Sequence, residues 1–169
     1  MNIRKLLSAA AASVMAMSLL CSCGQSGVLR LGTGNTGGNY YSYGTLLHEL
    51  DENGIEVKKT AGSQANLRLM NEGFIDMAIV QSDVLSEAVN GVGDFENEPV
   101  SGVRAVAGLY DEAFQIVVRS KSDINSIADL KGKKISVGDE GSGVAKNAEY
   151  LLLSAGVAFS SVEPVYMSY

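Results

Sequence analysis

Short apolar runs alternate along the chain with longer stretches in which apolar residues recur every three or four positions. The runs are typical of β-strands, whereas the recurring positions indicate amphipathic α-helices. Strands are predicted at 28–32, 55–60, 74–80, 103–110, 114–120, 134–138 and in the terminal VEPVYMSY. Strands that alternate with helices indicate an α/β protein with a mostly parallel sheet.

Four main helices are predicted between the strands, a short helix precedes strand 134–138, and residues 91–102 form an aperiodic surface loop. The first helix is predicted to begin near Asn39 and to end at Asn53-Gly54. The second is capped by Ser63 and ends at Gly73, and the third is capped by Ser82 or Asp83. The faces expected to be buried are Tyr43, Leu46, Leu47 and Leu50; Leu67, Met70 and Phe74; Leu85, Ala88 and Val89; and Val144, Ala148, Leu151, Leu152 and Ala155.

The N-terminus has the features of an export signal. Arg4 and Lys5 precede an apolar run at 6–20, which is too short for a membrane span of about 20 residues. Leu20, Ser22 and Cys23 resemble a bacterial lipobox, which predicts a signal peptide at 1–22, lipidation of Cys23 and a tether at 23–27. Cleavage before Cys21 is the weaker alternative, and an ordinary secretory signal is the other.

Charge and composition exclude several classes of site. Loss of residues 1–22 removes two positive charges, which moves the net charge from −6 to −8 and argues against nucleic acid binding. Both cysteines lie in the N-terminal segment, and His48, expected on the solvent side of its helix, is the only histidine. No metal site and no cofactor are therefore expected.

Residues 32–37, GTGNTG, match the dinucleotide fingerprint G-x-G-x-x-G. That site requires a carboxylate at the end of the second strand, where this chain has Lys58-Lys59-Thr60. A dinucleotide enzyme is therefore the disfavoured reading.

Four strands end in polar or glycine-rich loops that lead into helices: GTGNTGGNYY, TAGSQANL, VQSD and GDEGSGVAKN. In a parallel sheet these loops meet at the carboxyl edge, where ligands bind and where free helix N–H groups suit an anion. The candidate ligand-binding residues are Thr33, Gly34, Gly37, Gly38, Ser63, Asn66, Gln81, Ser82, Ser142 and Gly143. Ordinary helix caps and turns are the alternative for each loop taken singly.

No catalytic motif accompanies these loops. Ser82 and Ser142 do not lie in G-x-S-x-G, because Val80 and Glu140 stand at the first-glycine positions. Asp83 could serve as a general base, but a role as a helix cap is favoured. Arg68 either pairs with a ligand carboxylate or lies on the surface of its helix. Binding, not catalysis, is expected.

Four ordered motifs resemble the TAXI family of extracytoplasmic solute receptors for TRAP-type transporters: LGTGNTGGNYYSYG, AGSQANLRLMNEGFIDMAIVQSD, RAVAGLYDEAFQIVVRSKSDINSIADLKGKKISVGDEGSG and NAEYLLLSAGV. The resemblance implies a two-lobed, type II periplasmic-binding-protein fold that captures a small carboxylate, such as the amino acid glutamate or a dicarboxylate. It implies delivery of that ligand to TRAP-type permease subunits in the membrane. It also adds Tyr40, Tyr41 and Asp83 to the first lobe's ligand-binding residues.

On this resemblance, residues 28–110 form lobe 1, and 111–169 form the hinge and part of lobe 2. Family members are much longer, so the chain is expected to be the N-terminal part of a receptor with an incomplete second lobe. We expect exposed apolar surface, poor ligand binding and aggregation. An exported lipoprotein that senses a ligand without transport is the alternative function.

Overall fold

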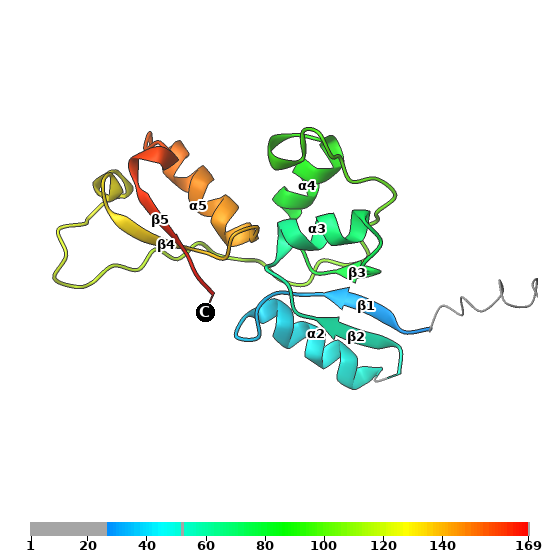
Figure 1. The fold of residues 1–169 in the computed structure, drawn as a ribbon. Helices are drawn as coiled ribbons and strands as arrows, with labels where there is room; N and C mark the ends of the chain where they lie inside the picture. Colours follow the sequence, from blue (N-terminus) through cyan, green and yellow to red (C-terminus); the bar gives the residue numbers. More distant parts are fainter. Residues whose placement is uncertain (1–26, 52, 169) are drawn as a thin grey trace, which may run out of the picture.

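The computed structural model describes residues 27–51 and 53–168 (Figure 1). The expected signal peptide and both Cys21 and Cys23 lie outside these residues, so export and lipidation stay predictions. Among the described helices, none is both long enough and apolar enough to cross a membrane.

The first unit, residues 28–100, is built on a parallel three-stranded sheet with the order β2-β1-β3. Its strands are β1 (Leu29–Gly32), β2 (Ile55–Lys58) and β3 (Met77–Ala78), the last much shorter than the predicted 74–80. Each strand is followed by a helix: α2 (Asn39–Leu50), α3 (Ser63–Asn71) and α4 (Ser82–Asn90). This alternation confirms the predicted α/β fold class.

The central strand β1 separates α2 from α3, because successive residues of a strand point to opposite faces. Leu31 and Thr33 face α2, where a Cβ added to Gly44 would lie 2.5 Å from the Thr33 methyl group. Gly32 faces α3, because a Cβ there would lie 2.7 Å from Asn66 Oδ1. The two helices therefore cover opposite faces of the sheet (Figure 1).

The predicted buried face of α2 is largely wrong. Tyr43, Leu46 and Leu50 are 37%, 52% and 77% exposed, while the residue that α2 buries is Gly44. The helix contacts the sheet through its smallest residue, so its larger apolar side chains lie on a flank. There Tyr43 stacks on Tyr110, with ring centroids 5.0 Å apart.

The main core of the first unit lies between α3 and α4 and includes part of the loop at 91–102. Leu67, Val84 and Ala88 pack there with Phe95 and Val100, all at most 2% exposed. Phe95 ends a short 3-10 helix, η1 (Gly93–Phe95). The loop predicted to lie on the surface therefore supplies two core residues.

Other predicted core residues are exposed because they lie at helix ends, beyond the packed part of each face. Phe74, Val89 and Val144 are 60%, 51% and 43% exposed, and Ala155 is also exposed. His48 was expected on the solvent side of its helix, but it is half-buried, and its Nδ1 lies 2.7 Å from the carbonyl oxygen of residue 55.

The second unit, residues 122–168, contains a parallel strand pair, β4 (Lys134–Gly138) and β5 (Glu163–Tyr166). Helix α5 (Gly143–Ser154) packs on it, with the short 3-10 helices η2 (Ile127–Leu130) and η3 (Phe159–Ser161). The core consists of Leu130, Leu152, Val157 and Val162. Strand β4 matches the predicted bounds 134–138.

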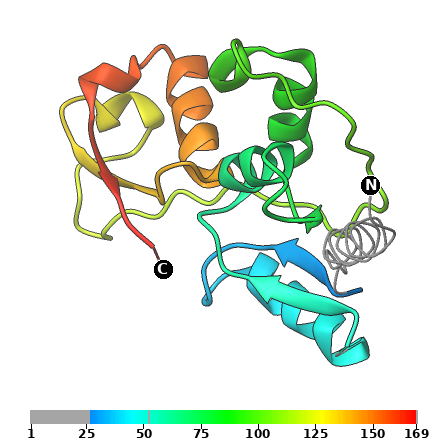
Figure 2. The same ribbon diagram turned by 45° about the vertical axis from the view of Figure 1, so that its right-hand side comes forward.

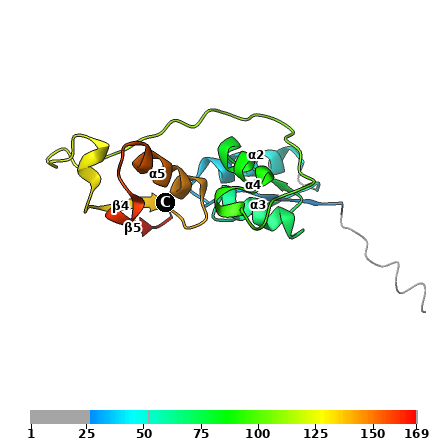
Figure 3. The ribbon, with the colours of Figure 1, turned by 90° about the horizontal axis from the view of Figure 1, so that it is seen from above.

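Residues 101–121, the crossing segment, join the two units as extended chain (Figure 3). The predicted strands at 103–110 and 114–120 are wrong, because this segment belongs to neither sheet of the described chain. Val106 and Val117 are 91% and 89% exposed. An alternating pattern forms a strand only where a neighbouring strand satisfies its backbone groups, and neither sheet does so here.

Candidate functional site

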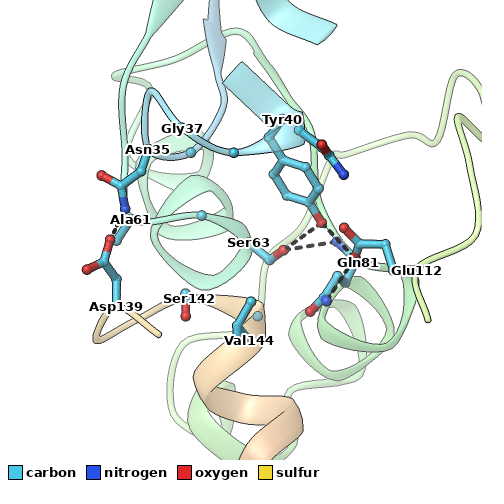
Figure 4. Close-up of a pocket in the computed structure, with 15 residues that line it drawn as sticks. Asn35, Gly37, Tyr40, Ala61, Ser63, Gln81, Glu112, Asp139, Ser142 and Val144 are labelled. Atoms are coloured by element: carbon cyan, nitrogen blue, oxygen red, sulfur yellow. Dashed lines mark hydrogen bonds between the residues drawn. The ribbon is translucent and has the colours of Figure 1, made fainter. Parts of the chain in front are cut away.

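Four loops, each following a parallel strand, meet around a cavity of about 310 Å³ between the two units. Figure 4 shows the loop of Asn35 and Gly37 on one side and Ser142 and Val144 on the other. The lining consists of Gly34, Asn35, Gly37, Gly38, Asn39, Tyr40, Ala61, Gly62, Ser63, Gln81, Glu112, Asp139, Ser142, Gly143 and Val144. The predicted meeting of loops at the carboxyl ends of the strands is confirmed.

Three of the four helices that begin at this cavity have no side-chain cap. The N-caps of α2, α3 and α4 are Gly38, Gly62 and Gln81, and none makes a side-chain bond to its helix. The predicted caps at Ser63 and at Ser82 or Asp83 are wrong, because all three residues lie within the first two positions of their helices. Uncapped helix starts present free N–H groups and the positive end of the helix dipole.

Helix α5 begins differently, since Ser142 caps it and its Oγ accepts the Ala145 N–H at 3.0 Å. The second unit therefore contributes a capped helix start to the cavity, and the first unit contributes three uncapped ones.

A polar network occupies one end of the cavity. Gln81 Nε2 donates to Glu112 Oε2 at 2.9 Å, and Tyr40 Oη donates to the same oxygen at 3.4 Å. Tyr110 Oη donates to Glu112 Oε1 at 3.1 Å, and the Gln81 N–H donates to Ser63 Oγ at 3.0 Å. Burial, together with the Glu112 charge, raises the pKa of both tyrosines well above the usual range, which keeps them protonated as donors.

The other end of the cavity holds a second carboxylate, Asp139, which accepts a hydrogen bond from Asn35 Nδ2. Among the described residues that line the cavity there is no lysine, arginine or histidine. The cavity thus combines positive helix ends with two carboxylates and several hydroxyl or amide groups. In the described part of the chain, no three metal-ligating side chains cluster as an ion site would require.

The structure brings eight of the thirteen predicted ligand-binding residues to the cavity and leaves five outside it. Those in the lining are Gly34, Gly37, Gly38, Tyr40, Ser63, Gln81, Ser142 and Gly143. Those outside it are Thr33, Tyr41, Asn66, Ser82 and Asp83.

Thr33 and Asn66 lie outside because their side chains hold the sheet edge together. Both are fully buried. Asn66 Nδ2 donates to the carbonyls of Thr33 and Ile79 at 2.7 and 2.9 Å, and Thr60 Oγ1 donates to Asn66 Oδ1 at 2.7 Å. Asn66 therefore ties together the chain segments that follow β1, β2 and β3.

Sequence reasoning missed two carboxylates, Glu112 and Asp139. Asp139 directly follows β4 in GDEGSG, so its place at a strand end was a usable signal. Glu112 had no such signal, because it lies in the crossing segment, where a hinge of two strands was expected.

The two units touch closely beside the cavity. The Ala65 N–H donates to the Gly141 carbonyl at 3.2 Å, and a Cβ on Gly143 would overlap the Gln81 side-chain amide. A Cβ on Gly62 would lie 3.6 Å from Ser142 Cβ. Glycine is therefore needed at 143, where the helix start of one unit meets the loop of the other.

Two solved structures are similar to this chain. The alkanesulfonate-binding protein SsuA from Xanthomonas axonopodis pv. citri, bound to MOPS, has 20% identity and a TM-score of 0.49, and the match covers 84% of this chain and 48% of that one. The periplasmic aliphatic sulphonate binding protein SsuA from Escherichia coli has 22% identity and a TM-score of 0.45, with 83% and 47% covered. The chain spans about half the length of the structures it matches.

A protein family described as NMT1-like matches residues 31–169. The matched range contains most of the chain, all but the first three residues of the first unit, the whole second unit and every residue that lines the cavity. The chain belongs to the NMT1-like family.

Proposed function

We propose that this protein is an extracytoplasmic solute receptor that captures a small carboxylate between its two units. The observation that carries the proposal is the cavity itself, which both units line with the loops that follow their strands. Ligands of open parallel sheets bind at this edge. A solute held by both units would favour their closed arrangement through its higher affinity for it.

The helix starts support a carboxylate as the anionic group. Helices α2, α3 and α4 begin at the cavity without a side-chain bond from their N-cap residues, and helix N-termini are suited to anions. In α3 and α4 the first two N–H groups are the ones available, because the Ala65 and Val84 N–H groups donate to Gly141 and Asp83. The cavity volume of about 310 Å³ is at the lower end of the usual range for ligand pockets and suits a small molecule.

The charges of the lining favour an amino acid over a dicarboxylate. An ammonium group would be attracted to Asp139 or Glu112, whereas a second ligand carboxylate would meet a like charge with no lysine or arginine among the lining residues. A ligand with both an anionic and a cationic group matches the helix starts and the two carboxylates together.

Membrane delivery is the second part of the proposal. The resemblance to TAXI receptors supports residues 28–110 and 111–169 as lobe 1 and as hinge with part of lobe 2, a lipid anchor at Cys23 and transfer of the ligand to a TRAP-type permease. The exported lipoprotein that senses without transport shares the same site. A permease gene beside this one would favour transport.

A thermal shift assay on the full chain tests the ligand. The panel is L-alanine, L-glutamate, succinate, glycine methyl ester, methanesulfonate and NAD. A ligand at a hundred times its Kd adds about 2.7 kcal/mol, which raises the midpoint by several degrees. Because the sequence predicts weak binding by this chain, each compound is added at high concentration. We expect amino acids to raise the midpoint most, succinate and methanesulfonate, which have no ammonium group, less, and the ester and NAD not at all.

The variant Gly34→Leu fills the cavity, because a Cβ at Gly34 meets only ordinary contacts, 3.6 Å to Tyr40 Cβ. Gly27→Leu is the matched control, with nothing within 4 Å of the added Cβ. We expect the shift to survive in the control and vanish in Gly34→Leu. A shift that persists in Gly34→Leu would contradict the site, and a shift with NAD alone would restore the dinucleotide reading.

A further inference from the structure

A buried lysine of the second unit lies among carboxylates of the first. Lys146, on α5, is 7% exposed, and its Nζ lies 2.9 Å from Asp94 Oδ2 and 3.9 Å from Glu87 Oε2. Glu149 Oε2, one turn further along α5, lies 3.8 Å away, and the Tyr150 ring centroid lies 4.8 Å away. Figure 2 shows α5 beside the helices of the first unit.

The two carboxylates from the first unit differ in their other contacts. Asp94 Oδ2 accepts a hydrogen bond from Gln64 Nε2 at 2.8 Å and its side chain is 43% exposed, whereas the Glu87 side chain, on α4, is 15% exposed. Glu87 Oε2 is buried and accepts no hydrogen bond from any described residue. Lys146 is therefore the cation that compensates this carboxylate when the units are together.

The titration of the group follows the same geometry. Burial raises the pKa of Glu87, while the Lys146 charge opposes that rise. Burial lowers the pKa of Lys146, but the hydrogen bond with Asp94 and the charges of Glu87 and Glu149 more than offset it, so that the pKa stands above its usual value. Lys146 therefore stays charged in the closed arrangement.

Lys146 also lies one turn from the cavity. Its backbone N–H donates to the Ser142 carbonyl at 3.4 Å, so Lys146 belongs to the first turn of the helix whose start lines the cavity. Holding Lys146 against the first unit holds Ser142 and Gly143 in place over the site.

We propose that Lys146 is a positioning residue that latches the second unit onto Glu87 and Asp94 and so completes the ligand cavity. This inference deepens the proposed function and rests on it for its purpose. The physical basis is that loss of the Lys146 charge leaves the Glu87 carboxylate, which is 15% exposed, largely buried and uncompensated, which is destabilising; Asp94, at 43% exposed, is hydrated and contributes less. When the two units are apart, water hydrates each charged group. The contact between the units is therefore favoured only when Lys146, Glu87 and Asp94 are all present.

The hydrogen-exchange rate of the Ala65 amide measures the contact between the two units, and no ligand is needed. This N–H lies in the first turn of α3, where a helix supplies no acceptor, and it donates to Gly141 of the second unit at 3.2 Å. Its protection therefore depends on contact between the units. Amides at Leu31 and Val137, in the sheets of the two units, report unfolding instead.

In Lys146→Met of the full chain, we expect the Ala65 amide to exchange at least about tenfold faster than in the wild type, with Leu31 and Val137 unchanged. Lys134→Met is the matched control, because it removes the same charge from the same unit, where Lys134 pairs at 2.7 Å with Glu163 in the open. Adding Glu87→Gln to Lys146→Met should restore most of the protection, because it removes the orphaned charge.

Equal exchange at Ala65 in Lys146→Met and Lys134→Met would overturn the latch. Equal acceleration at all three amides would also overturn it, since that pattern is general destabilisation. These exchange rates are measured without ligand and do not depend on ligand binding. If no ligand binds, that result contradicts the proposed function and not the role of Lys146.

Discussion

Polar side chains near the cavity divide into those that hold the chain and those that face the ligand space. Asn66 belongs to the first group, because its amide satisfies backbone carbonyls after β1 and β3 and accepts from Thr60. Ser63 and Gln81 belong to the second and line the cavity. Residue type alone does not separate the groups, since serine, asparagine and glutamine serve equally as structural and binding residues.

Asn66→Ala is expected to lower the free energy of unfolding by about 1–3 kcal/mol, because it leaves the buried Ile79 carbonyl without a donor and removes one of the two donors to the Thr33 carbonyl. Urea denaturation measures the change. Asn71→Ala, an exposed position at the end of the same helix, is the control and should change stability little. A similar loss of unfolding free energy in Asn66→Ala and Asn71→Ala would show that the Asn66 hydrogen bonds do not stabilise the fold.

The Arg30–Asp76 pair makes stability depend on acid. Arg30 Nε and Nη2 donate to Asp76 Oδ2 and Oδ1 at 2.8 and 2.9 Å. These bonds, with the Arg30 N–H, lower the Asp76 pKa to about 2. Because the folded value lies below the unfolded one of about 3.9, the stabilisation is complete above that pH and is lost as the pH falls toward 2.

Denaturation midpoints of wild type and Asp76→Asn should therefore differ by a constant amount at neutral pH and converge between pH 4 and 2. Asp123→Asn, which removes an equal charge from an exposed pair with Lys133, is the control. A gap between wild type and Asp76→Asn that stays constant down to pH 2 would show that Arg30 does not hold this carboxylate.

At the scale of elements, the crossing segment shows what a sequence pattern leaves out. Its alternating apolar residues are typical of strands, yet the segment pairs with neither sheet, and Phe114 is 60% exposed. A strand depends on its neighbours as much as on its own residues. Segments with few buried contacts and unpaired backbone are the first to admit a protease.

Limited chymotrypsin digestion should therefore cut first after Leu109, Tyr110 or Phe114 among the sites within residues 27–168. Mass spectrometry of the earliest fragments identifies the bond. Leu67, which is 1% exposed in the core, should be cut only after the unit unfolds. First cuts within 53–100 would contradict the unpaired state of the crossing segment.

The sequence predicted elements better than it predicted their contacts. Helix α2 begins at Asn39 and β4 spans 134–138 as expected, because the glycine-rich loops and the apolar period mark those ends. The buried face of α2 was predicted wrongly, because close packing through Gly44 leaves no apolar signal. Phe95 was missed as a core residue for a related reason, since a single aromatic in a loop has no period.

At the scale of the whole molecule, the cavity depends on residues far apart in the chain. Loops after β1, β2 and β3 could be placed at one edge from the rule for parallel strands, whereas β4 belongs to a separate sheet. Glu112, in the crossing segment, and Asp139, in the second unit, line the same cavity. No local sequence pattern predicts that these two residues meet there.

The proposed function requires that small carboxylates bind in this cavity through helix N–H groups. The most direct measurement is a ¹H–¹⁵N NMR titration of the full chain with L-alanine, L-glutamate and succinate, followed at the amides of 38–41, 63–64 and 82–83. We expect saturable shifts at these three helix starts with an amino acid, and we expect Gly34→Leu to abolish them. Shifts confined to other surfaces, or none with any of the three probes, would contradict it.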